Sequence, residues 1–593
     1  MGPRGWLAAV VLLMLPLSAQ ALEAALTAPG APDDVTARLR ASSAVLAAKG
    51  SGLTSGQEIY AAALSDYRTL VQVMYDAGYF SPVVSIRLDG REAAEISTIS
   101  PPTRVANIAV SVEPGRPFRF RTAQIAPLAP GTELPASFAP GRPASTGIIR
   151  DAGFAAKDGW RRAGYAKVTV GSQRIVARHP TAEIDADIRL LPGRQLRFGK
   201  LYVTGEDRVR EAAILRIAGI PTGEVYDPEM VQRLGARLRR TGAFKSVSIV
   251  EAPVANADGT LDFTVEVEEQ LPRRITFGAE VQSRSGVNLS AVWIHRNLFG
   301  NAERLRLEAD IRNIGGDQPI DGLIAVRLDN PARLGRDNNV FFLAELERIE
   351  RLHYNMDRFM LGVGIRRTKS AQLFGEASLT LSTARASDAF GDRDFNLLSL
   401  PLHVQLDKRD SSTNATRGYF LDGTVTPFTG FGQSASGVAA KLDARAYLSL
   451  SESGSIVLAG RLQLGSVAGA SLSEISPDLL FYSGGAGTVR GHPYQSLGVP
   501  VGTDTAGGRS MLVANAEIRA RVTEKIGLVA FFDYGAVDSS AFVSSVTASH
   551  SGAGIGLRYD IGAFGPIRFD IAAPVSGSTD DGLQFYLGIG QSF

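Results

Sequence analysis

Alternation of apolar and polar residues dominates the C-terminal half of this chain. From about Arg274 onward, segments of roughly 10–14 residues alternate strictly and are separated by Gly, Asn, Asp and Ser. In residues 304–312, one face carries only apolar side chains and the other only charged ones; the apolar residues are Leu305, Leu307, Ala309 and Ile311. A soluble sandwich can show the same alternation. These segments, however, follow one another over some 320 residues with no helical stretch between them.

A single antiparallel sheet of this length must close on itself to remove its edges. A closed barrel with apolar residues outside and polar residues inside is the form in which strands cross a membrane. We count sixteen strands, beginning near residues 273, 287, 303, 321, 340, 357, 372, 393, 418, 436, 453, 509, 525, 549, 566 and 582. An even number puts both ends of the barrel on the same side of the membrane. One connection, 470–508, is far longer than the others, and structureless loops of that length are usually functional.

The N-terminal half repeats with a period of about 80 residues. Three short segments have similar sequences, and each contains one shared glycine: Gly78, Gly164 and Gly242. Each follows a helical pattern and precedes an alternating strand, so each can close a helix in the left-handed conformation. A fixed period of this size predicts an array of small α+β domains. We place them at residues 22–104, 105–193 and 194–272, followed by the barrel at 273–593.

The amino-acid composition excludes several classes of function. The chain has no cysteine and only six histidines, which excludes disulfides, thiolate metal sites and cysteine nucleophiles. Its net charge of +2 gives no basic field for a nucleic acid. No nucleophile elbow, Ser/His/Asp order or dinucleotide loop in its proper context is found, so we expect no enzyme activity, cofactor or metal.

Residues 1–21 have the pattern of a secretory leader. Arg4 supplies a positive charge, an apolar run from Trp6 to Leu17 is too short to span a bilayer, and Ala19-Gln20-Ala21 fits a cleavage site. An uncleaved anchor is the alternative. The remainder is then expected in an exported, cell-envelope location.

Several motifs carry a specific resemblance. The long loop contains Val489-Arg490-Gly491, and the following strand contains Phe531-Phe-Asp533-Tyr-Gly535. Further matching segments are Asn515–Arg519, Asp407–Asp410 with Arg417–Tyr419, and Gly565–Asp570. Together they resemble the BamA/TamA superfamily of barrel insertases, and the N-terminal units resemble its POTRA domains. His492 stands where the superfamily usually has an aromatic residue after the glycine.

The resemblance implies three α+β POTRA repeats followed by a 16-stranded antiparallel transmembrane β-barrel. It also implies an outer-membrane location with the repeats in the periplasm. Three repeats look most like the TamA branch, which implies autotransporter-type clients and a TamB-like inner-membrane-anchored partner. Alternatives are a general BamA-like insertase or a two-partner secretion pore. Outside the superfamily, the alternative is a passive porin.

Alternation also predicts how the long loop is held. On residues 526–534 it turns Asp533 toward the lumen, and on the preceding strand it does the same for Glu517. Arg490 lies beside a glycine in a loop long enough to fold inward. One forked guanidinium can serve two carboxylates, so we expect Arg490 to pair with Asp533 and Glu517. A solvated loop arginine is the alternative.

The last predicted strand is weak and can form a lateral seam with the first. Gly588 and Gly590 reduce its packing. We expect the seam to lie between these glycines and the first strand, at Ile275, Phe277 and Gly278. A C-terminal recognition signal is expected to place four side chains on the lipid face: Phe585, Leu587, Ile589 and Phe593. A plain closing strand is the alternative.

Overall fold

The computed structural model describes residues 22–51, 55–282, 286–316, 319–432, 434–451, 453–544, 548–562, 565–577, 582–591 and 593. The expected leader, residues 1–21, lies outside the described residues. The chain forms two compact units. The first holds residues up to Gly199 with two short later segments, 222–230 and 253–261, and the second holds the rest of the chain to Phe593.

The first α+β segment is built on a four-stranded sheet in the order β1-β4-β2-β3. Its strands are β1 (Glu23–Thr27), β2 (Val83–Leu88), β3 (Arg91–Glu92) and β4 (Asn107–Glu113); its helices are α1 (Asp33–Ser42), α2 (Ala44–Ser51), α3 (Gly56–Asp76) and the short η1 (Ala93–Glu95). Leu39, Leu70 and Ile86 are fully buried in its core. Because β4 completes this sheet, the first segment extends past the boundary that we predicted after residue 104.

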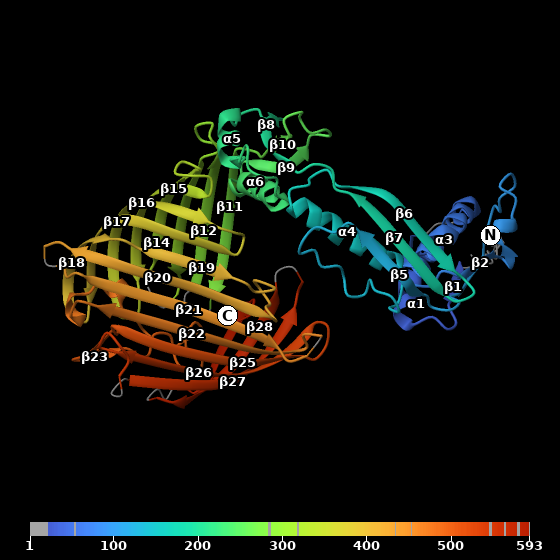
Figure 1. Cartoon of the computed structure of the whole chain (residues 1–593). Coiled ribbons are helices and arrows are strands. Elements are labelled where there is room, and N and C mark those ends of the chain that lie inside the picture. The colour runs from blue at the N-terminus through green and yellow to red at the C-terminus, as the bar shows by residue number, and fades with distance from the viewer. Residues whose placement is uncertain are drawn as a thin grey trace, which may run out of the picture. The chain divides into compact units, whose positions relative to one another are not determined.

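Two further α+β segments follow. The second has strands β5 (Arg119–Ala126), β6 (Thr169–Arg178) and β7 (Glu183–Leu191) in the order β5-β7-β6, with helix α4 (Thr146–Arg162). The third has β8 (Arg197–Thr204), β9 (Phe244–Glu251) and β10 (Thr260–Glu269) in the order β8-β10-β9, with α5 (Glu211–Ala218) and α6 (Pro228–Arg240). All three sheets are visible as separate ribbons in Figure 1.

The repeated glycines have one structural role. Gly78, Gly164 and Gly242 follow α3, α4 and α6, and their φ angles are 92°, 95° and 71°. A side chain with a Cβ rarely adopts these angles, so glycine lets the chain leave the helix directly toward the next strand. The 80-residue period in the sequence therefore reflects a repeated helix-to-strand turn.

The C-terminal half is one antiparallel sheet of seventeen strands that curls round, with its first strands green and its last ones red in Figure 1. The strands of its first half are β11 (Arg273–Gln282), β12 (Gly286–Arg296), β13 (Arg304–Ile314), β14 (Asp321–Pro331), β15 (Asn338–Glu350), β16 (Tyr354–Thr368), β17 (Leu373–Asp388), β18 (Gly391–Ser399) and β19 (Leu402–Asp407). Those of its second half are β20 (Gly418–Gly430), β21 (Gly437–Ser449), β22 (Ile456–Ala468), β25 (Ser510–Arg521), β26 (Ile526–Asp538), β27 (Ala548–Asp560), β28 (Pro566–Ser576) and β29 (Gln584–Ile589).

Two of these strands share one place in the sheet. Both β18 and β19 pair with β17 on one side and with β20 on the other. Leu400 and Pro401 separate them, and proline has no N–H for the ladder. The predicted strand starts agree with the observed ones to within three residues, and the break at Pro401 accounts for the additional strand.

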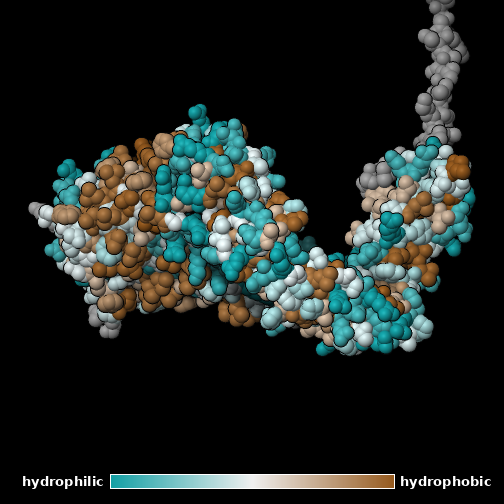
Figure 2. Space-filling model, turned by 45° about the horizontal axis from the view of Figure 1, so that its top comes forward, coloured by the Kyte–Doolittle hydropathy of each residue, from teal (hydrophilic) through white to brown (hydrophobic). Residues whose placement is uncertain are grey.

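The outer face of this sheet is apolar. Along β26, for example, Ile526, Leu528, Ala530 and Phe532 are exposed while the residues between them are buried or half-buried. Figure 2 shows hydrophobic residues gathered over the curled sheet. Among the described helices, none has both the length and the apolar character needed to cross a membrane.

Candidate functional site

The long connection folds against the inner face of the sheet. Residues 469–509, here called the inner loop, join β22 to β25. The loop contains short elements that we did not predict: η2 (Leu472–Glu474), η3 (Pro477–Leu479), β23 (Val499–Val501) and β24 (Asp504–Ala506). Its tip is completely enclosed, since Val489, Arg490 and His492 are at most 1% exposed.

Hydrogen bonds from the sheet hold the backbone of the loop tip. Asn515 Nδ2 donates to the Thr488 carbonyl oxygen at 2.6 Å, and Arg461 Nη1 donates to the Gly487 carbonyl oxygen at 3.1 Å. The N–H of Gly491 donates to the Tyr586 hydroxyl at 3.0 Å. Because these partners lie on β22, β25 and β29, the loop tip connects strands far apart in the sequence.

Arg490 is the centre of a buried ion cluster. Its Nε and Nη2 donate to the two oxygens of Asp533 at 2.7 and 2.9 Å, which is a bidentate pair. Its Nη1 donates to Glu517 at 2.7 Å and to Asp570 at 3.2 Å. The guanidinium also lies over the ring of Phe531, 3.5 Å from the ring centre. Buried charges need such complete pairing, because desolvation costs several kcal/mol per ion.

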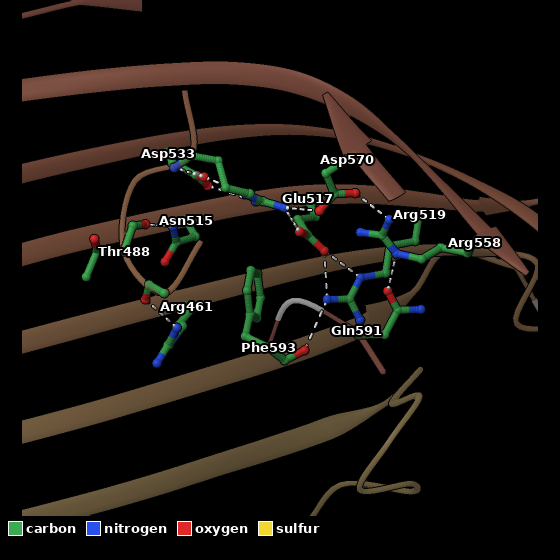
Figure 3. A network of polar contacts seen from close by, with 12 residues as sticks. Arg461, Thr488, Asn515, Glu517, Arg519, Asp533, Arg558, Asp570, Gln591 and Phe593 are labelled. Carbon is green, nitrogen blue, oxygen red and sulfur yellow. Dashed lines mark hydrogen bonds and ion pairs between the residues drawn. The ribbon is translucent and has the colours of Figure 1, made fainter. Parts of the chain in front are cut away.

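The cluster continues toward the last residues of the chain (Figure 3). Arg519 Nε donates to Glu517 at 2.8 Å, and its Nη2 donates to the main-chain oxygen of Phe593, the last residue, at 3.2 Å. Arg558 Nη1 donates to Asp570, and its Nε donates to Gln591 at 2.9 Å. The inner loop, strands β25 to β28 and the C-terminal residues therefore form one polar network.

Glycines on the inner face make room for the loop. A Cβ at Gly552 would lie 1.9 Å from the Arg490 carbonyl oxygen. At Gly535 it would lie 2.4 Å from Ser483 Oγ, and at Gly554 it would lie 2.5 Å from the Phe531 ring. The glycines of the run 552–556 therefore allow close approach of the loop backbone and the Phe531 ring.

The structure brings together the residues that alternation singled out. Arg490 contacts both Asp533 and Glu517 and lies over the Phe531 ring, while Gly535 lies against Val489 of the same motif. Sequence reasoning did not assign Asp570, Arg519 or Arg558 to this cluster. A usable signal existed, because all three alternate onto the inner face of their strands.

His492 packs against a second histidine. Its ring centre lies 4.2 Å from that of His550, and its Nε2 is 2.9 Å from the Ser551 carbonyl oxygen. His550 Nε2 in turn is 2.8 Å from Ser483 Oγ. The imidazole therefore fills the space expected for an aromatic ring and adds a hydrogen bond to β27.

The two strands expected to form a seam are the first and the last of the sheet order, β11 and β29. On β11, Ile275 and Phe277 are 59% and 74% exposed, and Gly278 packs against Ser290 of β12. On β29, Phe585, Leu587 and Ile589 are more than 60% exposed, as expected of a lipid-facing row. Gly588 lies in β29 against Arg568, and Gly590 follows the end of the strand.

The expected lipid-facing position of Phe593 is wrong. Phe593 is 7% exposed and packs inside with Ala415, Tyr447, Val457 and Ala459. The strand ends at Ile589, and Gly590 has a φ of 86°, so the alternation that we extended to Phe593 stops there. Within the described residues, no cluster of three or more His, Asp or Glu side chains could hold a metal ion.

Comparison with known proteins agrees with this architecture. Residues 274–593 match the Omp85 superfamily domain, and residues 196–270 match a POTRA unit described as a surface antigen variable number repeat. Two relatives are both called outer membrane protein assembly factor BamA. The one from Nitratidesulfovibrio vulgaris is 24% identical over 444 residues, covering 72% of this chain and 55% of the relative. The one from Neorickettsia risticii is 22% identical, covering 70% and 58%.

The chain thus spans little more than half the length of these relatives. A solved structure, BamA from Haemophilus ducreyi lacking POTRA domains 1–3, has the same fold; it shares 15% identity, with a TM-score of 0.60 over 79% of this chain and 98% of that one. The resemblance to the barrel-insertase superfamily is confirmed at that level, which places the protein in the outer membrane with its POTRA part in the periplasm. The superfamily domain covers more than half of the sequence, and the chain therefore belongs to the Omp85 superfamily.

Proposed function

We propose that this protein is an outer-membrane assembly factor that works without enzyme chemistry. It receives client proteins on its periplasmic α+β segments and promotes their insertion through a seam between β11 and β29. The name of the two relatives, outer membrane protein assembly factor, supports this function. If β18 and β19 are counted as one strand, the sheet has sixteen strands. In our proposal these strands form a closed transmembrane barrel in which β11 and β29 meet.

The shortness of the last strand carries the proposal. Within the described residues, β29 has six residues and pairs with β28 from Gln584 to Ile589, whereas β28 extends to Ser576. β11 is fully paired with β12 on one side and is the end of the sheet order on the other. Unpaired backbone at a sheet edge accepts an incoming strand by β-augmentation. A client strand can therefore add at this edge more easily than elsewhere in the sheet.

A cysteine panel across the seam tests this function. The chain has no native cysteine, so Ile275→Cys or Phe277→Cys can be combined with Phe585→Cys, Leu587→Cys or Ile589→Cys in a clean background. We expect the pairs that oxidise to lose client insertion and to regain it on reduction. Each single cysteine is the matched control. Full activity with a quantitatively closed seam would overturn the proposal.

We propose further that the protein is of the TamA type. Three α+β segments support this assignment, with autotransporter-type clients and a TamB-like inner-membrane-anchored partner. Extraction in mild detergent followed by co-purification tests it. Recovery of a large inner-membrane-anchored partner is the expected result. Recovery with general barrel-assembly lipoproteins would favour a BamA-like insertase instead, and recovery with one secreted protein would favour a two-partner secretion pore.

A further inference from the structure

The periplasmic end of the large sheet carries a group of cations where helix α6 meets it. Arg237 Nε and Arg240 Nη2, both on α6, lie 2.8 and 3.7 Å from the same oxygen of Asp337. Arg240 Nη1 also donates to the carbonyl oxygen of Thr368, the last residue of β16, at 3.3 Å. The arginines of α6 therefore lie against the end of β16.

The sheet places three more cations beside this contact. They are Arg366 and Arg367 at the end of β16 and Lys369 in the turn to β17. None of the three makes an ion pair within the part of the chain that the structure describes, and the carboxylate opposite Arg366 on β17, Glu376, pairs with Arg327. Together with the two arginines of α6, five cations share one ion-pair partner, so this region carries a net positive charge.

One of these cations continues the apolar row on the outer face of β16. Leu361, Val363 and Ile365 are exposed on that face, and Arg367 follows at the same two-residue spacing and is exposed as well. The row from Leu361 to Arg367 is about 20 Å long, compared with the ~15 Å depth of hydrocarbon in one leaflet. An apolar chain along this row would therefore have its charged end beside Arg367 and Lys369.

A shallow hollow on the outer face of the sheet includes two residues of this row. Its volume is about 460 Å³, and its lining includes Leu361 and Val363 of β16 together with Phe342 and Ala344 of β15 and Leu379 of β17. Every residue that lines the hollow is apolar or glycine. The hollow thus offers a place for a hydrocarbon chain on the same strand whose end carries the unpaired cations.

We propose that an anionic phospholipid of the periplasmic leaflet binds here, with its phosphate group beside Arg367 and Lys369 and one acyl chain in the hollow. The phosphate supplies negative charge to a region where cations outnumber carboxylates. Burial of the chain against the apolar lining adds the hydrophobic effect. A bound lipid would contact the end of β16 beside α6, and so hold the third α+β segment at the membrane surface. The inference rests on the outer-membrane location and not on the proposed function.

Lipid binding by the full chain tests the site. The protein is purified in an uncharged detergent and titrated with phosphatidylglycerol or with phosphatidylcholine of the same acyl chains, and native mass spectrometry counts the lipids that stay bound. We expect one phosphatidylglycerol to bind about fivefold more tightly than phosphatidylcholine, or better. Glycerol phosphate has the charge without the chains, so it should not displace the lipid at equal concentration. Displacement would identify a site for free phosphate and overturn the proposal.

Variants locate the binding to this end of the sheet. Arg367→Gln and Lys369→Gln each remove an exposed cation that has no ion pair within the described residues, so both proteins should fold normally. Each should bind phosphatidylglycerol about fivefold more weakly, with phosphatidylcholine unaffected. Arg385→Gln is the matched control, because it removes an 80% exposed arginine from the neighbouring strand, opposite Asp357 near the other end of β16.

A variant of the hollow tests the chain-binding part separately. Ala344→Phe fills part of the hollow with a ring, so it should weaken binding of both lipids while the preference for phosphatidylglycerol remains. Equal affinity of the unmodified protein for the two lipids, or the same preference in the cation variants as in Arg385→Gln, would overturn the proposal. Unchanged lipid binding by Ala344→Phe would do so as well.

Discussion

At the scale of single residues, Arg490 is the side chain on which the inner loop depends most. We expect Arg490→Ala to lower the free energy of unfolding by about 3–5 kcal/mol, because it leaves three buried carboxylates without their shared cation. Thermal or urea unfolding measures this loss, with the folded and unfolded protein distinguished by their different mobilities on gels. Arg385→Ala removes an exposed arginine and should cost less than about 1 kcal/mol. Equal losses for the two variants would contradict the assigned role.

The close approach of the Gly552 backbone to the inner loop leads to a second prediction about a single residue. Gly552→Ala should destabilise the protein by about 3 kcal/mol, since its Cβ would lie 1.9 Å from the Arg490 carbonyl oxygen and force the loop away. Gly487, in the loop tip itself, has no atom within 4 Å of the corresponding Cβ position. Gly487→Ala should therefore be nearly neutral in the same unfolding measurement. Tolerance of Ala at both positions would show that the loop adapts without cost.

At the scale of elements, helix α6 is held to a turn of the large sheet by ion pairs of Arg237 and Arg240 with Asp337. Arg237 on α6 donates to both oxygens of Asp337, in the turn between β14 and β15, at 2.8 and 3.1 Å. Partial burial by itself raises the pKa of Asp337, but the bonds from Arg237 outweigh it and hold the pKa below its usual range. The ionised pair therefore stabilises the contact between the third α+β segment and the sheet.

This pair predicts a pH dependence whose sign is fixed. A carboxyl group whose pKa is lowered by folding contributes stability above its ordinary pKa of about 4 and loses it as the pH falls through the lowered value. Asp337→Asn should cost about 1–2 kcal/mol at pH 7, and the gap to the unmodified protein should shrink below about pH 4. Asp207→Asn, which changes an exposed carboxylate of the same segment, is the control. A gap that stays constant from pH 7 to pH 3 would refute the pairing.

Much of the element level could be predicted from the sequence, because alternation reports directly which face of a strand is apolar and which is polar. The strand starts and the inward direction of Asp533 and Glu517 follow from it. The alternation rule fails where a proline or a turn interrupts the two-residue period of a strand. Pro401 splits one strand into β18 and β19, and the chain turns at Gly590 so that Phe593 is buried. Contacts between distant strands, such as Asp570 with Arg490, depend on the curl of the whole sheet, which alternation does not encode.

At the scale of the whole molecule, the α+β segments differ in how independent they are of the large sheet. The first has its own sheet and its own buried core around Leu39, Leu70 and Ile86. The third contacts the large sheet through Arg237 with Asp337, and the N–H of Arg210 donates to the Gly300 carbonyl oxygen at 2.9 Å. Deleting the first α+β segment and deleting the third should therefore have different effects on the stability of the large sheet.

Deleting residues 22–113 should leave the unfolding temperature of the large sheet unchanged, because this stretch contains one complete sheet and its core. If the periplasmic segments receive clients, as proposed, client recovery on co-purification should fall nonetheless. Deleting residues 197–269 should lower the unfolding temperature as well, since it removes the partners of Asp337 and Gly300. Unfolding of both deletion proteins beside the full chain, with co-purification from the same membranes, separates stability from client handling. Equal client recovery by the full chain and the first deletion would remove the first segment from the proposed role, whatever the stability of the sheet.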